Sequence, residues 1–162
     1  MKKLPLSQGK FALVDDDDFK RMNKHKWCCT NNRGTFYAIR TLNATAKRPK
    51  RKTFFLHREI LRAKKGQTVD HRNGNGLDNR KRNIRICTQQ QNTFNKRNDQ
   101  GSKCEYKGVT WSNESNKWKV RICVDGKSIY LGVHFCIVKA AKIYDEAAVK
   151  YHGDFARLNF PK

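Results

Sequence analysis

The sequence predicts an α+β fold. It consists of a small β-rich N-terminal region, a strand–strand–helix unit, and a three-stranded antiparallel sheet packed on one α-helix. Two patterns predict this order: short apolar runs of strand length between polar turns, and helix signals that separate these runs. The first region covers residues 1–98 and divides into a β-rich segment, 1–46, and the strand–strand–helix segment, 47–98. A linker, 99–103, leads to a second domain, 104–162.

In the β-rich segment, Phe11–Val14 reads as a strand, and Phe36–Arg40 reads as another strand after a turn at Asn31–Gly34. Four consecutive aspartates, Asp15–Asp18, precede a predicted helix. They could form a metal site, but carboxylates also accept the orphan N–H groups at a helix N-terminus and oppose its dipole. We favour the cap.

The next stretch, Lys47–Lys65, carries nine basic residues and one acid. Lys47–Lys52 suits a loop or strand edge along a phosphate backbone, and a solvated charge run is the alternative. Thr53–His57 leads into a short helix. Since such a histidine more often packs inside a small fold and satisfies backbone groups, we leave His57 out of the catalytic set.

A polar run then follows a strand that ends at Thr68–Asp70, and it extends as a Gly- and Asn-rich loop to Asn79. Asn83–Cys87 is a second strand, and a capping-box pattern begins a helix at Thr88, which places Asn92 about one turn into that helix. Two strands and a helix would bring four polar side chains together: Asp70, His71, Asn83 and Asn92.

These residue types suit phosphodiester hydrolysis. A carboxylate and an amide oxygen are hard ligands for Mg²⁺ or Mn²⁺. A neutral His71 can take a proton from the attacking water, and the side-chain oxygen of Asn83 could fix its tautomer. The metal would stabilise the phosphorane and the leaving 3′ oxygen. Basic side chains near the loop are available to clamp phosphates: Arg72, Arg80, Lys81, Arg82 and Arg85.

The charge points to a polyanionic partner, because 36 basic residues against 14 acidic ones give a net charge of +22. No apolar run approaches the length of a membrane span, so we expect nucleic acid rather than a membrane. The N-terminal residues lack the apolar core of a signal peptide, and a soluble intracellular protein is expected. Six cysteines contain no C-x-x-C pair, so we expect no structural zinc and reduced, mostly packed thiols.

In the second domain, Asp125-Gly126 is a two-residue hairpin turn, and Ile137–Tyr151 is an amphipathic helix. The turn pairs Cys123 with Ser128, Ile122 with Ile129, Arg121 with Tyr130, and Val120 with Leu131. The helix, through Ile137, Ala140, Ala141, Tyr144 and Ala148, would cover the apolar face. The opposite face is basic and suits a DNA major groove, with its expected contacts at Lys107, Lys117, Lys119, Arg121 and Tyr130.

The first region resembles the HNH homing endonucleases of phages and bacteria, which are ββα-metal nucleases. The residues that carry this likeness are His57-Arg58, Val69–Asn75, Asp78-Asn79-Arg80, Asn83 and Asn92. The resemblance implies that His71 is the general base, that Asp70 and Asn92 bind one divalent metal, and that Asn83 orients His71. Many relatives have histidine where this chain has Asn92.

The second domain resembles the ethylene-response-factor type of DNA-binding domain. This likeness is carried by Tyr106–Val109, Lys117-Trp118, Tyr130–Gly132, Ala140–Asp145 and Leu158–Phe160. In that family, arginines and a tryptophan on the sheet read bases. The matching positions here are mostly changed in type: Thr110, Arg121, Cys123, Ser128 and Tyr130.

Together these features predict a metal-dependent HNH DNA endonuclease, encoded by a phage or prophage and acting in the bacterial cytoplasm. It would use one Mg²⁺, with Mn²⁺ as an alternative, and would bind double-stranded DNA as a monomer. A DNA-binding regulator with a degenerate nuclease domain is the competing hypothesis. A basic RNA-binding protein fits the charge but leaves the four polar residues unexplained.

Overall fold

The computed structural model describes residues 1–32, 34–45, 50–98 and 104–161. The contacts within the chain divide it into two compact units, Met1–Thr88 and Gln89–Lys162. Both units combine short antiparallel strands with helices, so the predicted α+β class is confirmed. The predicted linker, 99–103, lies outside the described residues, as do residues 47–49 of the predicted phosphate-binding stretch, 47–52.

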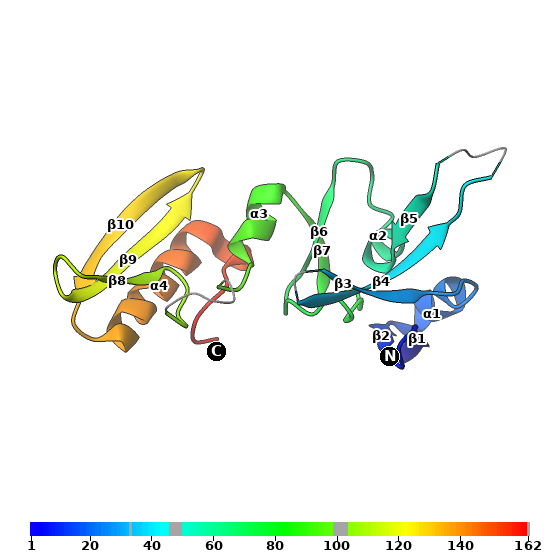
Figure 1. Ribbon diagram of the computed structural model, residues 1–162, viewed down its shortest axis with the longest axis horizontal. Helices are drawn as coiled ribbons and strands as arrows, with labels where there is room; N and C mark the ends of the chain where they lie inside the picture. Colours follow the sequence, from blue (N-terminus) through cyan, green and yellow to red (C-terminus); the bar gives the residue numbers. More distant parts are fainter. Residues whose placement is uncertain (33, 46–49, 99–103, 162) are drawn as a thin grey trace. The chain divides into compact units, whose positions relative to one another are not determined.

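Among its described residues, the first unit contains three small antiparallel sheets: β1 with β2; β3, β4 and β5, with β4 in the centre; and β6 with β7 (Figure 1). Its elements are β1 (Lys2–Pro5), β2 (Phe11–Val14), α1 (Asp16–Met22), β3 (Cys28–Asn32), β4 (Thr35–Leu42), β5 (Lys52–Phe55), α2 (Leu56–Leu61), β6 (Thr68–His71) and β7 (Ile84–Cys87). The sequence did not predict β1 or β3, because neither has a run of apolar residues.

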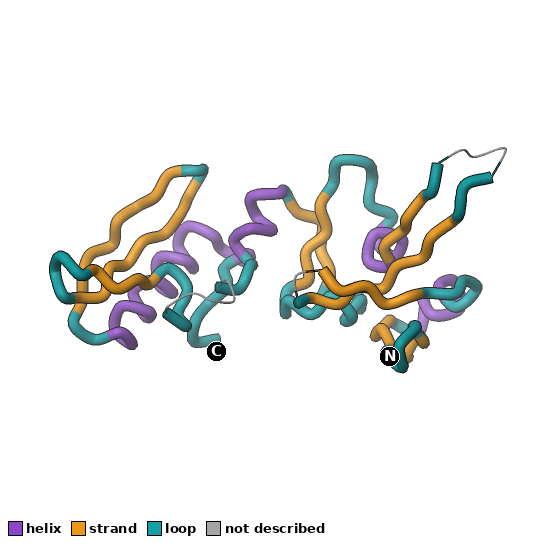
Figure 2. The backbone as a smooth tube through the Cα atoms, viewed as in Figure 1, coloured by secondary structure: helices purple, strands orange, loops and turns teal. Residues whose placement is uncertain are grey.

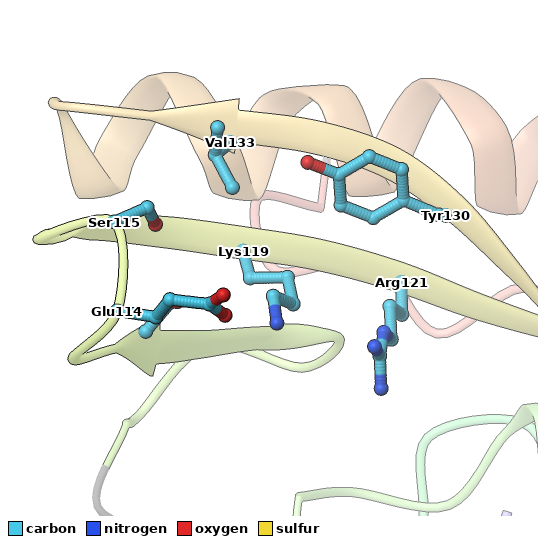
Figure 3. A pocket seen from close by; sticks show the side chains of 7 residues that line it. Glu114, Ser115, Lys119, Arg121, Tyr130 and Val133 are labelled. Carbon is cyan, nitrogen blue, oxygen red and sulfur yellow. The ribbon is translucent and has the colours of Figure 1, made fainter.

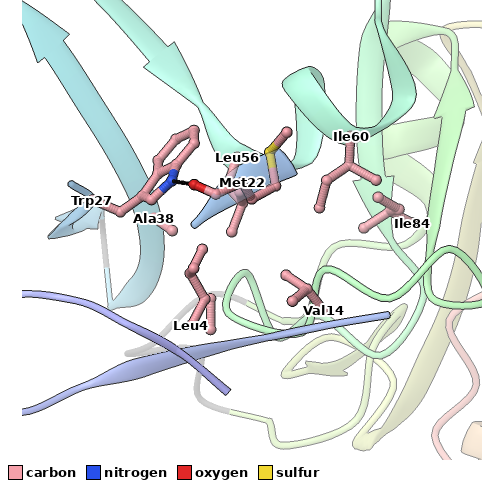
Figure 4. Close-up of a cluster of buried hydrophobic side chains, with 9 residues drawn as sticks. Leu4, Val14, Met22, Trp27, Ala38, Leu56, Ile60 and Ile84 are labelled. Atoms are coloured by element: carbon pink, nitrogen blue, oxygen red, sulfur yellow. Dashed lines mark hydrogen bonds between the residues drawn. The ribbon is translucent and has the colours of Figure 1, made fainter. Parts of the chain in front are cut away.

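An apolar core joins β1, β2, α1, β4, α2 and β7 (Figure 4). On β2, Ala12 and Val14 are buried while Phe11 is 43% exposed, as the alternation of a strand requires. Trp27 also packs into the core, and its Nε1 donates a hydrogen bond to the Met22 carbonyl oxygen at 2.9 Å. Burial of each such large apolar side chain stabilises the fold by about 1.5–3 kcal/mol. The core thereby fixes β2 and α1 beneath the polar loop between β6 and β7.

The aspartate run does begin a helix, α1, but not by the expected capping bond. Asp15 is the N-cap residue, and its side chain makes no capping hydrogen bond. Its Oδ2 instead accepts a hydrogen bond from the backbone N–H of Lys81 at 2.7 Å. The buried Asp18 forms ion pairs with Arg21 and Lys81. The run therefore ties the helix start to the polar loop.

The second unit has one three-stranded sheet, in the order β10–β9–β8, and three helical segments. Its elements are α3 (Gln89–Phe94), β8 (Val109–Ser112), β9 (Lys117–Val124), β10 (Lys127–His134), α4 (Ile137–His152) and a 3-10 turn, η1 (Gly153–Phe155). The helix predicted to begin near Thr88 is α3. By its contacts it belongs to this unit rather than to the first.

The β9–β10 hairpin confirms the predicted register as far as the pair of Arg121 with Tyr130. The next predicted pair is wrong, because Val120 lies opposite Gly132 and Leu131 is an extra residue in β10. Gly132 has a φ of 109°, a conformation open to glycine, and this accommodates the bulge. Beyond it, Val133 pairs with Lys119 and joins the outer face.

Helix α4 covers the inner face of the sheet, as predicted (Figures 1 and 2). Its side chains Ala140, Ala141, Tyr144 and Ala148 are buried against Val120 and Ile122 of β9, which are also buried. The close packing depends on Gly108, since a β-carbon there would overlap the Tyr144 ring. The apolar face of the sheet is therefore buried inside the unit by helix α4.

None of the helices that the structure describes combines the length and apolar character needed to cross a bilayer. None of the six cysteines is bridged in the structure. Only Cys29, Cys87 and Cys104 are buried, so the expectation of mostly packed thiols holds for half of them.

Candidate active site

Asp70 and His71 lie side by side at the end of β6 and are buried, with 4% and 6% of their surface exposed. In the antiparallel pair, Asp70 lies opposite Arg85 and His71 lies opposite Ile84 of β7. The two strands and the loop between them therefore exist as predicted. The hairpin brings the polar pair to the edge of the loop that joins its strands.

Side-chain hydrogen bonds to the backbone hold this loop in a defined shape. Asn73 Oδ1 accepts from the N–H of Asn75 at 2.9 Å, and Asn75 Oδ1 accepts from that of Leu77 at 3.0 Å. Asp78 is 2% exposed, and its carboxylate accepts two hydrogen bonds from the guanidinium of Arg80. That pairing holds the pKa of Asp78 below its usual value. The loop is thus pre-organised around a buried carboxylate.

The loop is also fastened to β2 and packed against β4. Leu13 of β2 donates its N–H to the Leu77 carbonyl and accepts from the N–H of Asn79, both at 2.8 Å. Gly76 lies so close to β4 that a β-carbon would overlap the Phe36 carbonyl and the Tyr37 ring. Distant stretches of the sequence therefore determine where the loop sits.

The His71 imidazole is enclosed by two other rings. Tyr37 and His57 meet it edge to face, with centroids 5.9 Å and 5.0 Å away. Burial lowers the pKa of His71, and the hydrogen bond with Asn79 and the charges of Asp70 and Asp78 act in the opposite direction. A lowered pKa keeps the ring neutral at pH 7, which is the form that can accept a proton.

His57 packs as the sequence analysis expected, on α2 between Tyr37, Phe55 and His71. Its Nδ1, however, has no hydrogen-bond partner among the described residues, so it does not satisfy a backbone group there. Burial lowers the pKa of His57 to about 3. It is therefore a neutral ring beside His71 rather than a second base.

Asparagine side chains have different partners from those expected. The Asn83 Oδ1 accepts from the N–H of Asn73 at 3.1 Å, and its Nδ2 donates to the Asp78 carbonyl at 2.7 Å. The hydrogen bond with the His71 Nε2 comes from Asn79, whose Oδ1 lies 3.3 Å away. Asn79 belongs to the motif that carries the nuclease resemblance, but the sequence assigned it no role.

Asp70 is the carboxylate that the sequence predicts to bind a metal. Its Oδ2 accepts hydrogen bonds from Nε and an Nη of Arg85, at 2.9 and 2.7 Å. The described residues hold no group of three His, Cys, Asp or Glu side chains that could bind a metal. One carboxylate fits Mg²⁺, which commonly takes one or two carboxylates and completes its shell with water and phosphate. Asn92 lies on α3 in the second unit, and its role in the site stays a prediction.

The predicted phosphate clamps of the first unit separate into two groups. Arg72 and Arg82 are exposed and available to a ligand. Arg80 and Arg85 are paired within the chain, with Asp78 and Asp70 respectively. The side chains of these two arginines are therefore held by carboxylates within the chain.

On the second unit, the outer face of the sheet carries a shallow pocket of about 370 Å³ (Figure 3). The side chains of Lys119, Arg121 and Tyr130, all predicted DNA contacts, line it together with Glu114 and Val133. The five positions that match the base-reading positions of the resembled family are all exposed: Thr110, Arg121, Cys123, Ser128 and Tyr130. The predicted face is thus open to a partner.

Two other predicted DNA contacts have partners inside the unit. The Lys107 ammonium donates to the carbonyl oxygens of Phe94 and Lys96, and burial lowers its pKa to about 8. The Lys117 ammonium lies 4.3 Å from the centroid of the Phe135 ring. Phe135, which the sequence analysis did not single out, is 80% exposed.

Comparison with known proteins finds viral relatives and plant relatives, although no protein-family model matches the chain. Over 155 residues it is 28% identical to an uncharacterized HNH endonuclease of Acanthamoeba polyphaga mimivirus, covering 94% of this chain and 76% of that protein. Protein 3.8 of Escherichia phage T7 is 29% identical over 94 residues, covering 58% of this chain and 77% of that protein.

A plant protein shares a shorter segment. An AP2-like ethylene-responsive transcription factor of Arabidopsis thaliana is 37% identical over 65 residues. These residues are 40% of this chain and only 13% of the plant protein. The chain is therefore similar over most of its length to a viral protein named as a nuclease, and over a shorter segment to plant transcription factors.

Proposed function

We propose that this chain is a metal-dependent HNH DNA endonuclease. The observation that carries the proposal is the buried Asp70-His71 pair, which stands at the end of β6 beside a pre-organised polar loop. Buried polar groups cost free energy unless they form hydrogen bonds. A loop whose hydrogen bonds serve mainly to satisfy such groups suggests a functional site. The similarity to the mimivirus protein supports the same class.

In this reaction His71 acts as the general base. Its lowered pKa leaves the imidazole neutral, so it can remove a proton from the water that attacks phosphorus. Asp70 would hold the divalent metal, Mg²⁺ or Mn²⁺. When bound, that ion would stabilise the negative charge on the phosphate and on the 3′ leaving oxygen. Arg85 orients the Asp70 carboxylate through its two charge-assisted hydrogen bonds.

The substrate in this proposal is double-stranded DNA, bound by a monomer. Exposed Arg72 and Arg82 contact phosphates near the site, and the outer sheet face of the second unit selects the sequence through Arg121 and Tyr130. The net charge of +22 supports strong, salt-dependent binding. One relative belongs to a phage of Escherichia, which supports a gene of phage or prophage origin. In this proposal the protein is a homing endonuclease that acts in the bacterial cytoplasm.

One observation favours a second candidate, a DNA-binding regulator with an inactive nuclease unit. The Asp70 carboxylate already accepts two hydrogen bonds from Arg85, and this arginine would compete with a metal for the same oxygen. In that case the second unit would bind DNA and the first would cut nothing.

A cleavage assay separates the two candidates. Supercoiled plasmid is incubated with the full chain and Mg²⁺ or Mn²⁺, with His71→Ala as the matched variant and chelator as a control. The nuclease proposal expects nicked or linear DNA from the wild type only, with both proteins shifting the same DNA in a gel. Wild-type chain that binds the plasmid and leaves it intact with either metal would establish the regulator instead.

A further inference from the structure

An acidic side chain lies among the basic side chains on the outer face of the second unit's sheet. Glu114 is exposed, stands in the turn between β8 and β9, and lines the pocket of about 370 Å³ together with Lys119 and Arg121. Its carboxyl end faces the Lys119 side chain (Figure 3). The pocket therefore combines one group that only accepts hydrogen bonds with two cations that only donate them.

These three charged side chains have no partner in the part of the chain that the structure describes. Neither an ion pair nor a side-chain hydrogen bond joins Glu114, Lys119 or Arg121 to another described residue. Arg80 and Arg85 of the first unit, by contrast, are each held by a carboxylate. The charged groups of the pocket are thus available to a ligand from outside.

The chemistry of DNA limits what the carboxylate can meet there. A carboxylate repels phosphates, so it lowers the affinity for every sequence unless a hydrogen-bond donor of the DNA approaches it. In the major groove, the donors are the N4 amino group of cytosine and the N6 amino group of adenine. Adenine also presents its N7 lone pair beside N6, and guanine and thymine present acceptors only. Cytosine is therefore the base whose edge suits Glu114.

We propose that Glu114 is a specificity-determining residue, which accepts a hydrogen bond from the N4 amino group of a cytosine in the major groove. This inference rests on the proposed function, in which the outer face of the second unit selects the sequence. The same carboxylate rejects guanine and thymine at that position, because their acceptor oxygens repel it. The DNA that this pocket selects then carries a cytosine at one defined position.

Selection from a pool of duplexes with a randomised centre tests the assignment, with the full-length chain and a chelator that prevents cleavage. The wild type should enrich a motif in which one position prefers cytosine. Glu114→Ala should remove the preference at that position only. Glu114→Gln should move it to adenine, since a glutamine amide pairs with N6 and N7 of adenine.

Glu146→Gln is the matched control. Glu146 is exposed on α4, the helix that covers the opposite face of the sheet, so the variant makes the same change of charge away from the pocket. It should enrich the same motif as the wild type. A general effect of removing one negative charge from the unit would appear in both glutamine variants.

A second measurement isolates the amino group of the base. Two duplexes carry the selected motif with either cytosine or 2-pyrimidinone, which is cytosine without its amino group, at the assigned position. The wild type should bind the cytosine duplex about tenfold more tightly, a size typical of one lost base contact. Glu114→Ala should bind the two duplexes with equal Kd, because it has no carboxylate to receive the amino group.

The assignment is overturned by a wild-type motif without a preferred cytosine, or by a cytosine preference that survives Glu114→Ala. Equal binding of the cytosine and pyrimidinone duplexes by the wild type would overturn it as well. In each of these cases the protein still binds DNA. A wild type that binds no duplex from the pool would instead overturn the proposed function, so the two failures are distinguishable.

Discussion

The two units bury polar groups in different ways. In the first unit, Asp70, His71, Asp78, Asn79 and Asn83 are all buried and all belong to one hairpin and its loop. Their hydrogen bonds run mainly from one member of this group to another or to the loop backbone. The first unit thus uses its buried polar groups to build a site.

In the second unit, the buried polar groups secure the scaffold. Asp145 accepts the backbone N–H groups of Asn159 and Phe160 at 2.8 Å each, and His152 Nε2 lies 2.9 Å from the Cys123 carbonyl. The side chains suited to DNA, Arg121 and Tyr130, stand exposed on the outer face of the sheet. The contrast teaches that a reacting group needs a closed polar surrounding, whereas a reading surface needs only a rigid apolar support.

The largest loss of stability should come from breaking the buried ion pair between Asp78 and Arg80 in the loop. Asp78→Ala leaves Arg80 without its partner and frees Asn73, and we expect a loss of about 3 kcal/mol in the stability of the first unit. Because the folded pKa of Asp78 is lowered, its contribution is present above the usual pKa of 3.8 and is lost as pH falls through the folded value. Urea denaturation at neutral and acidic pH measures both effects.

The exposed Asp17 provides the control, since Asp17→Ala should cost less than about 1 kcal/mol. Equal losses in the two variants would mean that the loop is not held by Asp78. The buried polar groups of the first unit would then not be what holds its loop in place.

A smaller effect should come from His57, whose Nδ1 is buried without a partner among the described residues. Replacing it by phenylalanine keeps a ring of similar shape and removes the unsatisfied nitrogen, so we expect a gain of about 1 kcal/mol. Thermal denaturation measures it, with His25→Phe at an exposed position as the control. A clear loss of stability would show that the ring nitrogens of His57 contribute to the fold.

The smallest effect should be a pH dependence of the free energy of unfolding of the second unit. The folded Lys107 loses its proton near pH 8, while the unfolded chain keeps it to about 10.5. Unfolding therefore takes up a proton between these values, and the contribution of Lys107 to the free energy of unfolding rises with pH across this window. The slope should be present in the wild type and absent from Lys107→Met, as measured by denaturation at several pH values. The same slope in both proteins would contradict the role given to this lysine.

Local patterns predicted much of this molecule. The β9–β10 hairpin followed from strand alternation and the Asp125-Gly126 turn, and the β6–β7 hairpin followed from two short apolar strands around a Gly- and Asn-rich loop. The bulge at Leu131 was missed because nothing in the alternating pattern marks an extra residue. Period-based prediction finds the strands but not their irregularities.

The candidate site was predicted in its residue types but not in all of its contacts. Asp70 and His71 could be found because they stand together at a strand end. The partnership of Asn79 with His71 depends on Leu13 and on the approach of Gly76 to β4, both far away in the sequence. The Arg85 contact with Asp70 depends on the register of a long hairpin loop. Such contacts arise from tertiary structure and leave no local signal.

The central claim is that the first unit cuts DNA and the second locates the site. It is tested most directly by measuring Kd and the single-turnover rate at saturating protein, on one DNA, for wild type, His71→Ala and Arg121→Ala. We expect His71→Ala to lower the rate about 10²- to 10⁴-fold with Kd unchanged. Arg121→Ala should raise Kd about tenfold while the saturating rate stays the same. If both variants changed the same quantity, the division of labour between the two units would be contradicted.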